Sequence, residues 1–326
     1  ALDVEGDLLV CCGDLQHDDV RDCSNFVGFY RNLRTVLTGK GVEWGMIQRE
    51  MSFVRRKRGG RGTWVSSVLA DSDHELLWSV DCGGGIVRAY STSTRTLAGA
   101  ATLPKAAVQS TDQYISFKFG LCRAGDILLA SAATGSVYSY SIPAFLAGKG
   151  TPKAIKVYND KLAFAGDMAA MDQNTVVVAP FNGDEAPMHS SIRVLDLPTA
   201  KVKQVLAGHI ERPTVSRQYC GLNVLLSFDE LRNAKLWDLR IGVPQLSIKG
   251  SFLDAIAVPL GASGCAAITS SRDECLRVWD LRQHLGGQCL YKMATGNLVG
   301  KSLHWSGSLN SLFVGTYSEH ETSHGR

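Results

Sequence analysis

Short apolar runs recur along the chain, and each is followed by a polar turn and then by a run in which apolar and polar residues alternate. The second half of the chain shows this order three times: TVVVAPF before SSIRVLDLP, NVLLSFD before NAKLWDLR, and CAAITSS before ECLRVWDLR. Alternation with a period of two predicts β-strands. The pattern predicts short strands joined by tight turns, and a single helical turn fits only the segment AFLAGKG.

The three alternating runs are evenly spaced. Their aspartates, Asp196, Asp238 and Asp280, are separated by 42 residues in both steps. Several short strands repeated every ~40–45 residues are typical of the blades of a β-propeller. The spacing therefore predicts that each run is the third strand of one blade.

The first half of the chain carries weaker copies of the same pattern, in which Arg31, Ser91 and Ser141 stand where the aspartate would be. A partial copy, SLHWSG followed by SLFVGTYS, lies near the C-terminus. We therefore predict one all-β domain over 1–326, a propeller of seven four-stranded antiparallel blades whose first and last blades are incomplete or closed by both termini. Its parts are strong repeats at 160–290, degenerate repeats at 1–150, a partial repeat at 296–318 and a polar tail at 319–326.

Composition narrows the class of protein. The charges nearly balance, with 34 Lys plus Arg against 31 Asp plus Glu, which does not by itself indicate nucleic-acid binding. Nine cysteines, with no CxxC pair, fit buried reduced thiols and predict a nuclear or cytoplasmic protein. No run of 18 apolar residues and no signal peptide is visible, so no membrane association is expected. The first residue, Ala1, is not methionine, which fits a fragment or a processed form.

The residues around 200–282 resemble the WD-repeat family of β-propellers. In that family a histidine, a serine or threonine, an aspartate and a tryptophan form a buried hydrogen-bonded network that holds each blade. The resemblance assigns this structural network to His209, Ser227, Asp229 and Trp237 in one blade and to Thr269, Asp273 and Trp279 in the next. Such a network stabilises a blade only when every buried polar group has a partner.

Both strong motifs read WDLR, and their arginines are Arg240 and Arg282. Paired WDxR motifs resemble the docking element of substrate receptors for cullin-4 RING ubiquitin ligases. The resemblance implies that Arg240 and Arg282, with Asp238 and Asp280, bind the ligase adaptor. A guanidinium group suits such an interface because it presents a planar fork of donors to carboxylates and carbonyls. If the arginines dock an adaptor, we expect both to be exposed and free of strong ion pairs with Asp238 or Asp280, because a guanidinium held by an internal carboxylate is less available to a partner. The alternative is that WDLR is an ordinary solvated turn of the scaffold.

The segment FVRRKRGGRGTW contains the one cluster of positive charge. It is compatible with a nuclear-import signal, with contact to a nucleic-acid backbone, or with a solvated loop. Contact with a nucleic-acid backbone would make the protein a scaffold in a ribonucleoprotein or chromatin assembly. The residues concerned are Arg55, Arg56, Lys57, Arg58 and Arg61.

No enzymatic motif is complete. GNLVGKS has three residues between its glycines where a phosphate loop needs four, no histidines form HxxxH on a helical segment, and no GxSxG occurs. We therefore predict a non-catalytic protein with no cofactor, no metal and no small-molecule substrate, acting through protein partners. A propeller enzyme with a site in the central channel remains the alternative from another class.

Overall fold

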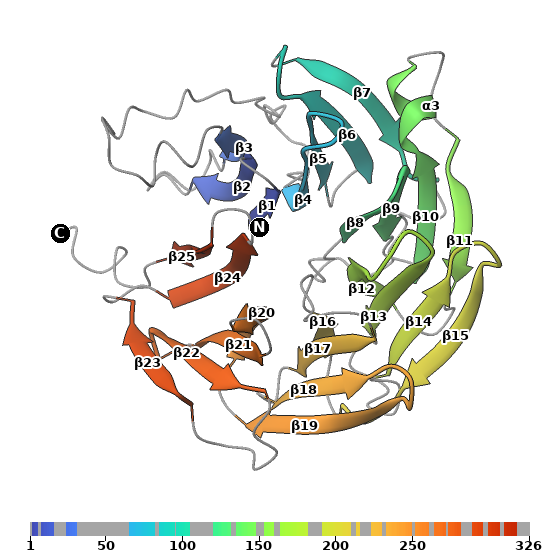
Figure 1. The fold of residues 1–326 in the computed structure, drawn as a ribbon. Coiled ribbons are helices and arrows are strands. Elements are labelled where there is room, and N and C mark those ends of the chain that lie inside the picture. The colour runs from blue at the N-terminus through green and yellow to red at the C-terminus, as the bar shows by residue number, and fades with distance from the viewer. Residues whose placement is uncertain are drawn as a thin grey trace. The chain divides into compact units, whose positions relative to one another are not determined.

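A computed structural model describes most of the repeat region, and strands make up most of what it describes (Figure 1). The described residues are 2–5, 8–15, 24–30, 65–81, 85–94, 96–104, 120–131, 135–147, 153–159, 164–181, 191–209, 213–215, 223–229, 233–249, 252–260, 264–271, 273–281, 289–295, 299–306 and 310–317. They form antiparallel sheets of up to four strands in chain order. The predicted all-β propeller fold is confirmed.

The chain divides into two compact units, of which the first comprises 1–167 and 306–311. Its sheets are β1-β2-β3, β4-β5-β6-β7 and β11-β10-β9-β8. The strands are β1 Leu2–Glu5, β2 Leu8–Leu15, β3 Ser24–Tyr30, β4 Val65–Asp71, β5 Leu76–Asp81, β6 Ile86–Ser91, β7 Leu97–Thr102, β8 Leu121–Ala124, β9 Ile127–Ser131, β10 Ser136–Ser141 and β11 Ile155–Asn159.

The second unit comprises 168–305 and 312–326. It holds three four-stranded sheets and the two-stranded sheet β24-β25. The strands are β12 Phe164–Ala170, β13 Thr175–Phe181, β14 Ile192–Asp196, β15 Lys201–Leu206, β16 Pro213–Val215, β17 Val224–Asp229, β18 Asn233–Asp238, β19 Val243–Lys249, β20 Phe252–Leu260, β21 Gly264–Ser271, β22 Cys275–Asp280, β23 Tyr291–Ala294, β24 Val299–Ser306 and β25 Ser311–Tyr317.

The alternating runs of the sequence are the third strands of their sheets. β14, β18 and β22 each lie between an apolar strand and an outer strand, and each ends on one of the three evenly spaced aspartates. β18 and β22 share one burial pattern, in which the second residue and the tryptophan are buried and the other residues are less buried.

The one helix among the described residues is α3, Ile142–Leu146, which begins within the connection after β10. Ser141 caps it, because the Ser141 hydroxyl accepts a hydrogen bond from the Ala144 amide at 3.4 Å. Pro143 suits the first turn, where an amide N–H has no partner inside the helix. The helix begins two residues ahead of the segment AFLAGKG that the sequence favoured.

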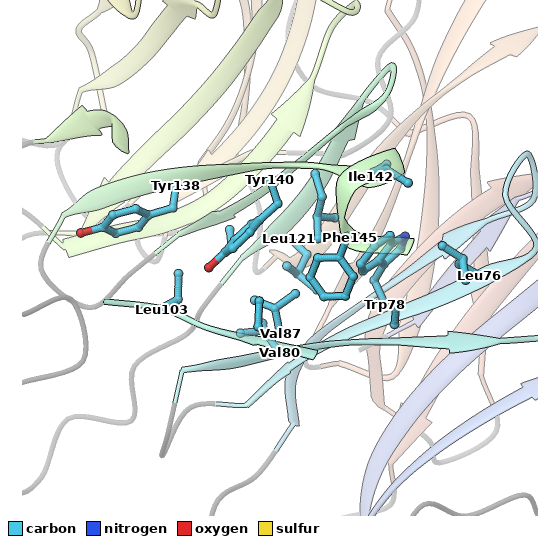
Figure 2. Packing of buried hydrophobic residues seen from close by; sticks show 14 residues of the cluster. Leu76, Trp78, Val80, Val87, Leu103, Leu121, Tyr138, Tyr140, Ile142 and Phe145 are labelled. Carbon is cyan, nitrogen blue, oxygen red and sulfur yellow. The ribbon is translucent and has the colours of Figure 1, made fainter. Parts of the chain in front are cut away.

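α3 completes the core of the first unit, as Figure 2 shows. The Phe145 ring meets the Trp78 ring edge to face, with 4.9 Å between the ring centroids. Phe145 also lies against Gly99 of β7, where an added Cβ would come within 2.8 Å of the Phe145 ring. Gly99 is therefore required by the close approach of the helix to the strand.

The core of the second unit lies between successive sheets. Trp237 of β18 is buried among Ile192 and Leu206 of the preceding sheet and Val215 of its own sheet. Trp279 of β22 is buried against Leu226, Leu246 and Ile248 of the sheet before it. Each tryptophan thus joins its own blade to its neighbour.

Candidate functional site

The turn after β18 is built around Asp238. The Asp238 carboxylate accepts hydrogen bonds from the Arg240 amide N–H and from the Arg240 Nε–H, both at 2.9 Å. The Asp238 carbonyl accepts from the Gly242 amide at 2.8 Å, and Gly242 has a φ of +72°, which favours glycine. These bonds fix the turn that carries Arg240.

Arg240 is the exposed end of this turn. Its side chain is 72% exposed, yet its Nε and Nη2 both bond to the Asp238 carboxylate. The hydrogen bond from the Arg240 side chain, with that from the Arg240 amide, lowers the pKa of Asp238 to about 2. Among the described residues Nη1 of Arg240 has no partner, so the guanidinium group is held in place with one nitrogen directed outward.

The other evenly spaced aspartates end their strands in the same way. Asp280 ends β22 as Asp238 ends β18, and Leu281 follows it. Arg282, the next residue, lies outside the described residues. After β14 the arginine is replaced by Pro198, and the Thr199 amide and hydroxyl donate to the Asp196 carboxylate instead. The shared role of Asp196 and Asp238 is therefore to cap the turn.

One blade holds a complete buried network. The Trp237 Nε1–H donates to the Ser227 hydroxyl at 2.7 Å, Ser227 lies 2.6 Å from His209 Nε2, and His209 Nδ1 lies 2.9 Å from the Asp229 carboxylate. With the His209 proton on Nδ1, every donor meets an acceptor. Burial raises the pKa of Asp229, but hydrogen bonds from His209 and from Asn233 outweigh it and lower the pKa. The four residues named from the sequence thus lie together and hold the blade.

The next blade holds only part of such a network. The Trp279 Nε1–H donates to the Thr269 hydroxyl at 3.0 Å. Asp273 does not join this pair: its half-exposed carboxylate bonds to Arg277 at 3.0 Å and lies 3.4 Å from Lys292 Nζ. Ser271 holds the register position that Asp229 holds in the other blade, and Asp273 lies two residues later, beyond the end of β21. Asp273 therefore ties a turn to a strand at the surface.

A third blade shows what happens when the hydroxyl partner is missing. In β10, Tyr140 takes the register position of the tryptophan, and the position of Ser227 is held by Ala130. The Tyr140 hydroxyl is buried and has no hydrogen-bond partner among the residues that the structure describes, and burial raises its pKa to about 12.

We expect Tyr140→Phe to raise the free energy of unfolding by about 1 kcal/mol, because it removes a buried polar group without a partner. Urea denaturation measures the change. Tyr138→Phe, on the same strand, is the control and should lack this gain. A loss of more than about 1 kcal/mol in Tyr140→Phe would show that the hydroxyl has a partner.

The first unit contains a buried polar network that the sequence did not indicate. Asp71, at the end of β4, has a fully buried side chain that accepts from Trp78 Nε1 at 3.0 Å and lies 3.0 Å from His74 Nδ1. Arg123 of β8 also donates to Asp71, and its other terminal nitrogen donates to Asp73. Arg123 thereby links two neighbouring sheets. The segment DSDHELLW contains the two aspartates, the histidine and the tryptophan of this network. Arg123 lies 52 residues from Asp71 along the chain, so no local pattern joins it to them.

Beside the Arg240 turn lies a cavity of about 90 Å³. Lys203 and Gln204 of β15 form one wall, and Leu239 of the turn forms another. Asn223 also lines the cavity, and its carbonyl accepts a hydrogen bond from the Leu239 amide at 2.7 Å. A space of this size admits a few water molecules or one side chain of a partner.

The predicted basic cluster lies outside the described residues, and the described residues contain no metal site. The basic residues Arg55, Arg56, Lys57, Arg58 and Arg61 lie outside the described residues. In the described part of the chain, no group of three or more His, Cys, Asp or Glu residues could hold a metal ion. No helix in that part is long and apolar enough to cross a membrane.

Comparison with known proteins agrees with this architecture. No protein-family model matches the sequence, and no curated protein matches it. Among solved structures, the chain is similar to the C-terminal WD40 domain of Sif2, with a TM-score of 0.56 and 12% identity over 95% of this chain and 73% of that chain. The chain has the WD40 propeller fold. Because 1397 chains of solved structures match, this fold does not select a partner or an activity.

Proposed function

We propose that this WD40 propeller is a non-catalytic scaffold for protein interactions, and that it binds the propeller adaptor of a cullin-4 RING ubiquitin ligase through its DLR turns. The observation that supports the proposal is the exposed guanidinium of Arg240, which Asp238 holds in one orientation. The protein would then present a substrate to the ligase through its other surfaces.

The geometry suits a docking contact for physical reasons. A flexible arginine loses conformational entropy when a partner immobilises it, and Asp238 has already removed part of that freedom. The outward Nη1 of Arg240 can donate to a carbonyl or a carboxylate of the partner. Ile241 and Val243, which follow Arg240, are exposed and supply apolar contact area. Arginines next to apolar side chains are common among the residues that contribute most of the binding energy of an interface.

The proposal is tested by measuring the affinity of the purified chain for the purified adaptor by calorimetry. We expect Arg240→Ala to weaken binding by about 2 kcal/mol, or about 30-fold in Kd. The thermal unfolding midpoint should stay unchanged, because an exposed ion pair contributes about 0–1 kcal/mol. Arg282→Ala should act in the same way, and the double variant should lose detectable binding.

Lys249→Ala provides the matched control, because Lys249 is an exposed cation at the opposite end of β19 from the DLR turn. Its removal should leave the Kd unchanged. Adaptor binding that survives in the double arginine variant would refute docking through these turns. An adaptor that never binds the wild-type chain would refute the ligase partner.

A further inference from the structure

The cavity beside the Arg240 turn opens between two neighbouring sheets of the second unit. Its walls come from the sheet β12-β13-β14-β15 and from the next sheet, β16-β17-β18-β19. Gln204 of the first sheet lies so close to Gly242 of the turn that a Cβ added at Gly242 would clash with the Gln204 amide. A partner that binds the exposed Arg240 side chain therefore has the mouth of this cavity beside it.

The residues that line the cavity differ in burial and in polarity. Met171 and Val194 are only 8% and 2% exposed, and Leu239 is half-buried. Asp172 and Lys203 are exposed and carry opposite charges. The inside of the cavity is thus apolar and its mouth is polar, which suits a side chain with an apolar stem and a polar end.

Both charged groups at the mouth have unused hydrogen-bonding capacity. Among the described residues, the Lys203 ammonium group has neither an ion pair nor a hydrogen bond. Asp172 accepts a hydrogen bond from the Asn174 amide at 2.7 Å through Oδ1, and Oδ2 has no partner in that part of the chain. The mouth therefore offers one donor group and one acceptor group to a ligand.

The opposite charges select the polar end of the occupant. A carboxylate would be attracted by Lys203 and repelled by Asp172, and an ammonium group would be attracted and repelled in the reverse way. A primary amide is neutral and carries both a carbonyl acceptor and N–H donors, so it satisfies both groups. Glutamine and asparagine are the side chains that end in a primary amide.

We propose that the cavity binds a glutamine or asparagine side chain of the ligase adaptor, whose amide donates to Asp172 Oδ2 and accepts from Lys203 Nζ. The apolar stem of that side chain covers Met171, Val194 and Leu239. The inference rests on the proposed role of Arg240, and it extends the docking surface from one sheet to two.

Two variants that change the charge in opposite directions test the proposal by calorimetry with the purified adaptor. Lys203→Met keeps most of the aliphatic stem and removes the donor. Asp172→Asn keeps Oδ1 for the Asn174 amide but puts a donor in place of Oδ2. We expect each variant to raise the Kd about fivefold to tenfold. The thermal midpoint should stay unchanged, because both side chains are exposed.

The direction of the two effects identifies the occupant. A carboxylate in the cavity would make Lys203→Met weaken binding and Asp172→Asn strengthen it, and a cationic group would reverse both signs. Any result other than weakening by both variants overturns the proposal. If both leave the Kd unchanged while Arg240→Ala abolishes binding, the docking of Arg240 stands without the cavity.

Two control variants make the same changes of charge elsewhere. Lys249→Ala removes a cation at the opposite end of β19 from the DLR turn, and Asp273→Ala removes a carboxylate at the opposite end of β22 from Asp280. Both should leave the Kd unchanged, which separates local contact from long-range attraction between the two proteins.

A probe that does not need the adaptor separates failure of the cavity from failure of the ligase role. N-acetylglutamine methylamide should shift the methyl NMR signal of Met171 in the full chain, with a Kd on the order of 10 mM. Met171→Leu assigns the signal. The shift should vanish in the double variant Lys203→Met/Asp172→Asn. No shift in the wild type overturns the amide site, whereas a shift without adaptor binding refutes the ligase adaptor as its source.

Discussion

Replacing Trp237 with alanine is expected to lower the free energy of unfolding by about 3–5 kcal/mol, the usual cost of removing a large aromatic side chain from a core. Trp237 is fully buried and packs against the preceding sheet. Its indole N–H also donates to the Ser227 hydroxyl, which loses this donor in the variant. Urea denaturation followed by circular dichroism measures the change.

Trp237→Phe separates the packing from the hydrogen bond. Phenylalanine keeps much of the ring volume but has no N–H, so we expect a loss of about 1–2 kcal/mol. Trp279→Ala should resemble Trp237→Ala, because Trp279 is buried and bonded to Thr269 in the same manner. A loss under about 1 kcal/mol for Trp237→Ala would mean that the indole lies outside the core.

Asp71→Asn is expected to cost about 3 kcal/mol, because it leaves the Arg123 guanidinium without its buried negative partner. The amide also turns one of the two acceptor oxygens into a donor that faces other donors, among them Trp78 Nε1. The loss should appear as a lower urea midpoint. Asp73→Asn is the matched control: Asp73 also binds Arg123 but is exposed, so it should cost about 0–1 kcal/mol.

A double-mutant cycle with Arg123→Met checks the assigned cause. If the unpaired charge of Arg123 accounts for the loss, Asp71→Asn in the Arg123→Met background should cost at least about 1 kcal/mol less than in the wild type. Equal costs in both backgrounds would show that Asp71 acts through Trp78 and His74 alone.

Most of the fold could be read from the sequence because strand periodicity is local. The run TVVVAPF coincides with β13, and NAKLWD coincides with β18. The even spacing of Asp196, Asp238 and Asp280 predicted the order of strands within a blade, since each aspartate ends a third strand, and Asp196 and Asp238 cap the turns that follow. Even the degenerate copies, such as TGSVYSYSIP, became strands in the expected place.

The contacts of the candidate sites were harder to predict because they depend on pairing across sheets and on strand length. Asp71 and Arg123 meet from different blades, so no local pattern joins them. Asp273 looked like the partner of the Thr269 and Trp279 pair, but Ser271 holds the register position of Asp229, and Asp273 binds Arg277 instead. The expectation that Arg240 is free of an internal ion pair is wrong, because Asp238 and Arg240 lie two residues apart and the Arg240 side chain bonds to the Asp238 carboxylate.

The hydrogen bond between indole and hydroxyl makes the cost of two mutations in a blade depend on which of the two residues is replaced first. Losing the hydroxyl first, as at Ala130 beside Tyr140, leaves a buried polar group without a partner. Losing the ring donor first leaves a serine or threonine whose hydroxyl can still bond to another acceptor. In the blade of β13 and β14, Leu195 takes the tryptophan position and Val178 the serine position, so both groups are lost and the core there is apolar. The less costly mutational path to such a blade therefore begins at the tryptophan.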